Sequence, residues 1–505
     1  MKRLTGLLSF ILLGNLTLTS CSSDDNNSIQ LTPIAIEKST GTYLGNVDSK
    51  GSFKIVLNTN KGDFHLDFIS NLVADENLLE ATLKSETYLF SEGAALLYTF
   101  TEKSFLKQGD AQFKLVGGEI TVTKNNALYT FKGQVKDEQG LTYDFNYTDA
   151  LDIEPIYDTT YEIQNGWYWG DDVFEHPNVA EYMTFFTQGE ADKYGQLEGD
   201  GHHISLSMFD AMAPKAWEAK IPNKTYKAST EFKVGSFKVG SKEAIESGEI
   251  DYSFATFQHN DKAAGIKEEL YILDGSIKVM ENKEGQEVRF NILLQNGKRH
   301  LGKYVGKVKQ GDQYTISTLR ADKKVETLTQ GFLEYKGKSP ITEKQNNRWN
   351  IYLYAETVTL HPEEYFRAEG SGEWMRVTIY SDVNATTDIP VGEFPIGEEM
   401  AGNAGSGGGT EPGLDWGTWY FSINNDETTS YAPTRTGTVK IEKTGDQYTV
   451  SLNAIDDREN KIKASYTGAL AFVNNASRTA NTAAKSVKKS YNKGKKFDAA
   501  KNSRK

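Results

Sequence analysis

The chain has 505 residues and a formal net charge of −13, with 69 Asp and Glu against 56 Lys and Arg. That length is more than one hydrophobic core accommodates, since domains usually contain roughly 100–200 residues, so we expect several domains. The acidic composition argues against nucleic-acid binding through the folded domains, because such binding needs a basic surface.

Residues 1–20 have the features of a signal peptide. A short basic start, Lys2-Arg3, precedes an apolar stretch at 7–13 that is too short to span a bilayer. Small residues then lead to Cys21, which is the only cysteine of the chain. The arrangement resembles the lipobox of bacterial lipoproteins, which implies cleavage before Cys21 and attachment of Cys21 to lipid. An ordinary signal peptide that contains a cysteine is the alternative.

A polar and acidic linker covers residues 21–33. Its Asp24-Asp25 pair resembles the surface-export signal of Bacteroidetes lipoproteins, although an acidic linker also serves as a solvated spacer. The resemblance implies a lipid-anchored protein of the outer membrane that is exposed at the cell surface. A lipidated Cys21 leaves no thiol for a disulfide, so the stability of the domains must come from buried apolar area.

The body of the chain contains three divergent copies of one pattern. Each copy has a glycine followed 29 residues later by a tyrosine; the pairs are Gly118 and Tyr147, Gly275 and Tyr304, and Gly437 and Tyr466. Each copy also begins with Tyr-x-Gly, at Tyr43, Tyr168 and Tyr335, and the second and third contain Ile-Pro-x-x-x-Tyr/Phe from Ile221 and Ile389. Apolar and polar residues alternate between these landmarks, as in half-buried strands, and helical periodicity is nearly absent.

These landmarks predict an all-β protein of three tandem antiparallel β-sandwich or small β-barrel repeats. The predicted repeats are residues 34–150, an enlarged second copy at 158–308, and a third at 325–470 with a glycine-rich insertion at 401–410. The ordered landmarks resemble a tandem β-domain repeat of Bacteroidetes surface lipoproteins of unassigned function. The resemblance implies an outer-surface location and a role in nutrient acquisition, and it transfers no binding residue.

Binding residues are expected where one copy departs from the shared pattern, and the second copy departs most at Trp167-Tyr168-Trp169. Strand alternation places Trp167 and Trp169 on one face and Tyr168 on the other. Flat aromatic rings stack on sugars, and the adjacent Asp171 and Asp172 can accept hydrogen bonds from hydroxyls or bind Ca²⁺. The alternative is that both tryptophans belong to the core of a larger domain.

Further candidates are scattered. Trp419 of the third copy is a second ligand-binding candidate, whereas the landmark tyrosines are expected to be structural. Adjacent His202 and His203 point to opposite faces of a strand, which argues against a shared metal ion. Asp158-Thr159-Thr160 has the form of the Bacteroidetes O-glycosylation motif.

Catalytic signatures are missing from the sequence. It contains no Gly-x-Ser-x-Gly elbow and no His-Glu-x-x-His, and we expect neither a metal nor a cofactor. Acidic pairs such as Glu363-Glu364 and Glu398-Glu399 keep a glycoside hydrolase among the alternatives.

The tail at 476–505 is basic, with ten Lys and Arg against one acid from Arg478 onward, and is expected to be disordered. We expect a non-catalytic, lipid-anchored surface protein that binds a glycan or another nutrient, with a polysaccharide as its partner. A structural or adhesin-like protein with an outer-membrane protein partner is the alternative, and a glycoside hydrolase is the third.

Overall fold

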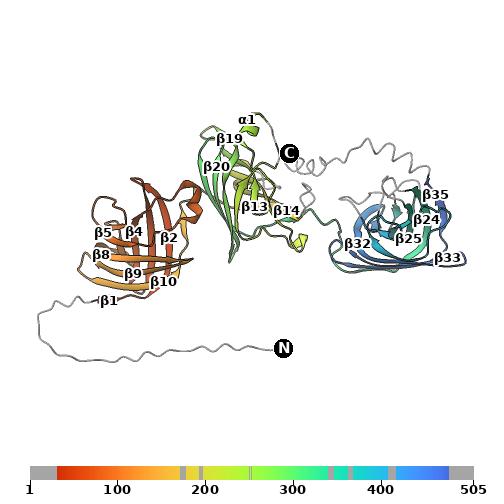
Figure 1. The fold of residues 1–505 in the computed structure, drawn as a ribbon, viewed down its shortest axis with the longest axis horizontal. Helices are drawn as coiled ribbons and strands as arrows, with labels where there is room; N and C mark the ends of the chain where they lie inside the picture. Colours follow the sequence, from red (N-terminus) through yellow and green to blue (C-terminus); the bar gives the residue numbers. More distant parts are fainter. Residues whose placement is uncertain are drawn as a thin grey trace, which may run out of the picture. The chain divides into compact units, whose positions relative to one another are not determined.

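The computed structural model describes residues 31–170, 178–192, 197–248, 251, 253–338, 346–361, 368–407 and 417–476. In this part of the chain three separate sheets of eleven strands follow one another along the sequence (Figure 1). A two-stranded sheet and three short helices complete the described elements. The prediction of three tandem all-β repeats is confirmed.

The strands of the first repeat are β1 Leu31–Pro33, β2 Ile36–Val47, β3 Lys50–Thr59, β4 Gly62–Ser70, β5 Thr87–Ser91, β6 Thr99–Thr101, β7 Phe105–Gln108, β8 Ala111–Asn125, β9 Leu128–Asp137, β10 Thr142–Ala150 and β11 Ile153–Pro155, with the 3₁₀ helix η1 Asp75–Glu80. The strands of the second repeat are β12 Thr159–Tyr161, β13 Ile163–Gly170, β14 Val179–Ala191, β15 Leu197–Ala211, β16 Thr225–Ser229, β17 Ser236–Lys238, β18 Thr256–Asp261, β19 Ile266–Asn282, β20 Gly285–Leu294, β21 Arg299–Gly306 and β22 Gly311–Asp312, with η2 Ala216–Glu218 and α1 Lys242–Glu246. The strands of the third repeat are β23 Lys323–Val325, β24 Leu328–Lys338, β25 Asn347–Ala355, β28 Gly372–Ser381, β29 Gly392–Gly397, β30 Ala404–Gly405, β31 Trp419–Asn424, β32 Glu427–Thr444, β33 Gln447–Asp456, β34 Lys461–Gly468 and β35 Ala471–Asn474; the hairpin β26 Val358–Leu360 and β27 Ala368–Gly370 is inserted between β25 and β28.

All three sheets have the same strand order. In the first repeat it is β1-β10-β9-β8-β5-β6-β4-β3-β2-β11, with β7 bridging β4 and β8, and the corresponding strands take the same places in the other two. The sheets curl into barrel-like units, since β2 approaches β10 and β24 approaches β34. By its internal contacts the chain divides after Ile156, so the first repeat is one compact unit and the rest is another.

Each opening Tyr-x-Gly forms a β-bulge. The register shifts between Tyr43 and Gly45, between Tyr168 and Gly170, and between Tyr335 and Gly337. The three glycines have positive φ angles of 110°, 65° and 76°, a conformation that residues with a side chain rarely adopt. The motif is therefore a structural signature of a bulge on the first long strand.

The leading glycine of each Gly-to-Tyr pair lies where two backbones approach closely. Gly118, Gly275 and Gly437 have φ angles of 121°, 143° and 123°. A Cβ atom there would lie 2.1, 2.3 and 2.2 Å from the carbonyl oxygens of Gln134, Asn291 and Asn453, respectively. Only glycine fits these positions, which explains why this landmark is common to the three copies.

The closing tyrosines end the meander and explain the following glycine. The Tyr304 hydroxyl donates to the Lys307 carbonyl at 3.0 Å, and the Tyr466 hydroxyl donates to the Ala469 carbonyl at 2.7 Å. Each ring lies against the glycine two residues later, where a Cβ would meet the hydroxyl at 2.6 and 2.4 Å. In the first repeat the glycine is replaced by Asp149, and Tyr147 donates to its carboxylate instead.

Apolar side chains fill the interior of each repeat. Phe68 of the first repeat packs against Tyr88, Phe100 and Phe131, with ring centroids 4.9 to 6.4 Å apart. Complete burial of such a ring stabilises the fold by about 1.5–3 kcal/mol. The interiors are therefore packed cores.

The outer face of the sheet distinguishes the repeats. In the first repeat β3 alternates, with Phe53 and Ile55 buried and Lys54 exposed. In the matching strands of the other two repeats all residues at 180–187 of β14 and at 347–353 of β25 are buried, so both faces of these strands are covered. The second and third repeats thus carry an additional layer that the alternating pattern of the first repeat lacks.

Candidate functional site

Trp167 and Trp169 lie on the first long strand of the second repeat. Tyr168 between them is fully buried in the core, whereas both tryptophans are half-buried. Trp167 packs edge-on against Phe185 of β14, with ring centroids 5.3 Å apart. Trp169 lies in the bulge between Tyr168 and Gly170. Both rings therefore keep part of their surface available to a ligand.

The same strand positions carry different chemistry in the other repeats. When the bulges are matched, Thr42 and Leu44 of the first repeat are the equivalents of Trp167 and Trp169. Leu44 is exposed. The counterparts in the third repeat are Glu334 and Lys336.

Glu334 and Lys336 are both almost completely buried. The Lys336 ammonium lies 3.5 Å from the Glu334 carboxylate, and the Asn475 amide donates to that carboxylate at 2.6 Å. Tyr352 and Asn350 also donate to it, each at 3.2 Å. This position is therefore a sealed ion pair in the third repeat and an open aromatic pair in the second.

A buried amide lies on the opposite face of this strand from the tryptophans. Gln310 is 9% exposed, and neither its Nε2 nor its Oε1 atom has a hydrogen-bond partner. Its amide packs on Gly166, where a Cβ would be 2.8 Å from Nε2. Gly166 lies on the same face of β13 as Tyr168, so Gln310 packs on the interior side and does not join the surface that the tryptophans present.

The remaining predicted ligand residues are not brought to this place. Trp419 is 0% exposed and stacks on Phe421 in the outer apolar layer of the third repeat, so its ring offers no open face to a ligand. Its burial follows from the second layer over this sheet, which the alternation pattern does not reveal. Asp171, Asp172 and the lipidation candidate Cys21 lie outside the described residues.

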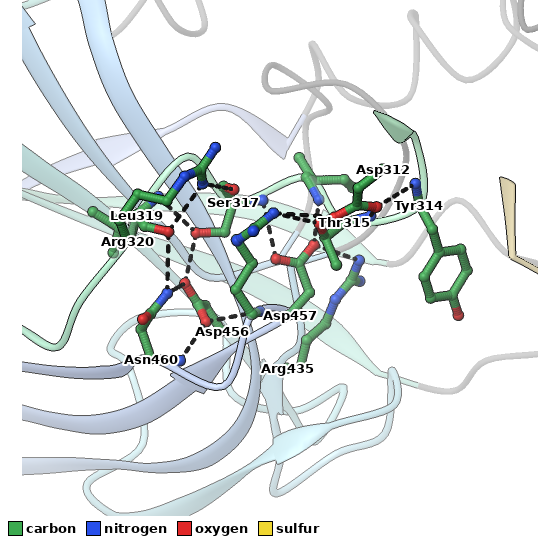
Figure 2. A network of polar contacts seen from close by, with 12 residues as sticks. Asp312, Tyr314, Thr315, Ser317, Leu319, Arg320, Arg435, Asp456, Asp457 and Asn460 are labelled. Atoms are coloured by element: carbon green, nitrogen blue, oxygen red, sulfur yellow. Dashed lines mark hydrogen bonds and ion pairs between the residues drawn. The ribbon is translucent and has the colours of Figure 1, made fainter. Parts of the chain in front are cut away.

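A pair of adjacent carboxylates in the third repeat is structural. Figure 2 shows Asp456 and Asp457 at the turn between β33 and β34, where they hold the segment that connects the second and third repeats. Asp456 accepts from Ser317 Oγ at 2.6 Å and from the backbone of its own turn. Asp457 accepts from the backbone N–H groups of Ile316 at 2.6 Å and Ser317 at 3.0 Å.

Burial raises the pKa of Asp457, and the backbone donors oppose that effect. Both carboxylates of the turn are occupied by hydrogen bonds of the fold. The pair therefore resembles a clamp and does not resemble an acid–base dyad with room for a substrate.

Arg458 of the same turn reaches the second repeat. Its Nη1 donates to Asp312 at the end of β22, at 3.0 Å, and its guanidinium carbon lies 4.8 Å from the ring of Trp217 in η2. Arg458 is therefore a link between the second and third repeats, and Trp217 is engaged by it.

Three histidines meet at one end of the interior of the second repeat. His202 of β15 lies 4.5 Å from His259 of β18 and 5.8 Å from His300 of β21, measured between ring centroids. His203 faces the other way, with its Nδ1 atom 2.8 Å from Thr187 Oγ1. The prediction that His202 and His203 point to opposite faces is thus confirmed, but the meeting of His202 with two distant histidines was missed.

The spacing of the three histidines from core residues on their strands indicates this cluster in the sequence. His202 precedes the core residue Ile204 by two positions, His259 follows the core residue Phe257 by two, and His300 precedes Tyr304 by four. Even spacing on a strand puts each histidine on the same face as its core reference. Strand pairing then aligns His202 directly with His259.

The first strand of the repeat, β12, contacts this cluster. Tyr161 Oη lies 2.9 Å from His300 Nε2, and Thr159 Oγ1 lies 3.4 Å from His202 Nδ1. Within the O-glycosylation motif at 158–160, Thr159 is buried, whereas Asp158 and Thr160 are exposed.

The environment favours the neutral forms of His202 and His300. Burial, with the neighbouring His202 and His259, lowers the pKa of His300 to about 3. Burial and then His259 lower the pKa of His202. The Asp158 carboxylate is 3.8 Å from His300 Nδ1, but its side chain is 56% exposed, so water screens its attraction.

Within the described residues, no group of three or more His, Cys, Asp or Glu side chains is arranged to hold a metal ion. The near-parallel rings of His202 and His259, with 15° between their planes, illustrate why, since stacked rings do not direct their nitrogens at a common point.

No protein-family model matches the chain, and no curated protein matches it. Among the helices that the structure describes, none is long and apolar enough to cross a membrane. The functional argument therefore rests on the sequence and on the geometry above.

Proposed function

We propose that the chain is a lipid-anchored cell-surface protein of a Bacteroidetes outer membrane that binds a glycan without catalysis. The observation that carries the proposal is the half-buried pair Trp167 and Trp169 in the second repeat. The same positions are filled by exposed or sealed non-aromatic residues in the other copies. Aromatic surface that one copy alone presents is typical of a ligand contact on a shared scaffold.

The flat, partly exposed rings of Trp167 and Trp169 support a sugar as the ligand, because aromatic rings stack on the apolar face of a sugar. Lipid display through Cys21 would place that site in front of extracellular polysaccharide.

Binding of a soluble chain that lacks the lipidation site, residues 22–505, to a polysaccharide panel tests the proposal. We expect retention on at least one polysaccharide and a loss of at least tenfold in affinity in Trp167→Ala and in Trp169→Ala. Trp217→Ala is the matched control, because Trp217 is also half-buried and is engaged by Arg458. Equal affinity of all variants, or no retention on any polysaccharide, would refute glycan binding at this site.

Anchoring is tested separately. Cys21→Ser should abolish incorporation of labelled palmitate, and a protease added to intact cells should digest the unmodified protein. Protection from the protease in intact cells would contradict surface exposure.

A structural or adhesin-like role is the second candidate. The clamp of Asp456 and Asp457 and the contact of Arg458 with Trp217 tie the second and third repeats together, as expected of a spacer. Stoichiometric co-purification of an outer-membrane protein without added sugar would favour this role over glycan binding. Release of reducing sugar from a polysaccharide would instead support a glycoside hydrolase.

A further inference from the structure

The three histidines close one end of the second repeat, and imidazole is the side chain whose free form gains a proton in mild acid. His202, His259 and His300 all face the interior, and His300 is 6% exposed. The pH range in which free imidazole gains a proton lies near pH 6.5. A charged imidazole at the position of His300 would need hydration that the folded end does not provide.

The charged groups around the cluster do not compensate for such protonation. Asp158, which precedes β12, is the one carboxylate of the described residues within 4.0 Å of these rings, and it is largely exposed. Glu268 of β19 is paired with His259 across the sheet and is exposed, and Asp261 lies beyond His259 on β18. From β14, the neutral Gln188 faces His202, with its Oε1 atom 3.2 Å from Nδ1.

The remaining titratable neighbour is Tyr161 of β12, and burial raises the pKa of its hydroxyl, which therefore stays protonated in acid. Two protonated rings separated by 4.5 to 5.8 Å would also repel each other. Protonation of the cluster can thus be accommodated only if this end of the repeat opens to water.

The element that can yield is β12. It pairs with β21 alone, over three residues, and its two contacts with the cluster are those of Tyr161 with His300 and of Thr159 with His202. A short parallel strand at the end of a sheet is the part most easily detached.

The third repeat provides an internal comparison. Strand matching places Glu373 at the position of His202, Ser422 at that of His259 and Ile462 at that of His300. Glu373 is an ion-pair partner of Lys323 and accepts from the Tyr420 hydroxyl at 3.0 Å. The corresponding end of this repeat therefore has no imidazole to titrate.

We propose that His202, His259 and His300 form an acid-sensitive closure of the second repeat, and that their protonation releases β12 from the sheet. The first strand after the connection from the first repeat would then detach in acid while the third repeat stays closed. This inference does not depend on glycan binding. It assigns to the second repeat a response to acidification of the surroundings.

Labelling of an introduced thiol tests the release. Thr159→Cys places a thiol on β12, and Val325→Cys places one at the equivalent position of β23, which is buried as well. In the mature chain with Cys21→Ser, each variant has a single thiol. The thiols are labelled with a disulfide reagent that reacts in acid, and each rate is divided by the rate of a freely accessible thiol at the same pH. The corrected rate for Thr159→Cys should be at least tenfold higher at pH 4.5 than at pH 7.5. The corrected rate for Val325→Cys should not change.

A background without the imidazoles assigns the effect. The triple variant His202→Gln, His259→Gln and His300→Tyr should show no acceleration of labelling in acid. The residues introduced at 259 and 300 are those that the first repeat has at the equivalent positions, Gln108 and Tyr143. Hydrogen exchange of the unsubstituted chain, corrected for intrinsic rates, covers the case in which this variant does not fold. Faster exchange at pH 4.5 in residues 157–162 and not in residues 323–327 is expected. Equal acceleration in both repeats, acceleration that survives in the folded triple variant, or no acceleration would overturn the proposal.

Discussion

The second and third repeats have one strand order and one set of structural landmarks, yet their side chains differ in two places. On the outer face of the first long strand, the second repeat has half-buried Trp167 and Trp169, and the third has the sealed pair Glu334 and Lys336. At the interior end, three histidines replace a carboxylate that is paired with a lysine. A conserved frame thus supports an open aromatic surface in one copy and a closed polar layer in the other.

The largest expected effect comes from breaking the frame itself. Gly437→Ala should destabilise the third repeat by about 4 kcal/mol or more, because its φ is 123° and a Cβ would lie 2.2 Å from the Asn453 carbonyl oxygen. Gly445→Ala is the matched control: it also has positive φ, but nothing lies within 4 Å of its Cβ, so about 1 kcal/mol is expected. Urea unfolding followed by hydrogen exchange of the third repeat measures both, and equal losses would refute the steric explanation.

The sealed pair should respond far more strongly to truncation than the open pair at the same positions. Lys336→Ala leaves the buried Glu334 without its cation and should cost about 3 kcal/mol. Trp169→Ala removes a half-buried ring and should cost only about 1 kcal/mol. The two melting temperatures, each measured for its own repeat, provide the comparison. A smaller loss in Lys336→Ala than in Trp169→Ala would show that the sealed layer does not carry the stability assigned to it.

The histidine end should make the second repeat selectively sensitive to acid. The pKa of His300 in the folded repeat, about 3, is below its unfolded value near 6.5, so the unfolded state binds the proton more tightly. The contribution of His300 to the free energy of unfolding is fully present above pH 6.5 and is lost as the pH decreases toward 3. The expected loss at pH 5 relative to pH 7.5 is about 2 kcal/mol. The urea midpoints of the second and third repeats at pH 5 and pH 7.5 test this expectation. His300→Tyr should reduce the change in the midpoint of the second repeat between the two pH values. A parallel decline in the third repeat would contradict it.

The smallest effect distinguishes the closing tyrosines. Tyr466→Phe removes the bond to the Ala469 carbonyl and should cost about 1 kcal/mol. Tyr147→Phe should cost less than about 0.5 kcal/mol, because Tyr147 is half-buried and its bond to Asp149 is exposed to water. Thermal unfolding of the two variants measures the difference, and a larger loss in Tyr147→Phe would reverse the assigned roles.

Much of the fold was predictable because its landmarks are local. A bulge needs glycine two residues after its tyrosine, and a close backbone approach needs glycine at Gly118, Gly275 and Gly437, so these requirements are visible in a single chain. Strand alternation likewise predicted that Tyr168 and Trp167 point to opposite faces of their strand. The candidate site was only partly predictable. Trp419 was predicted as a ligand-binding residue, but the outer layer of the third repeat buries it.

The sequence by itself determined three tandem β-repeats and their matching landmarks, because backbone conformation and strand alternation leave a mark within a few residues. Only the tertiary structure decided which faces are covered and which side chains meet. Gln310 reaches Gly166 across more than a hundred residues, and His202, His259 and His300 come from three separate strands. Such meetings depend on strand order and curvature, which arise from the packing of the whole repeat.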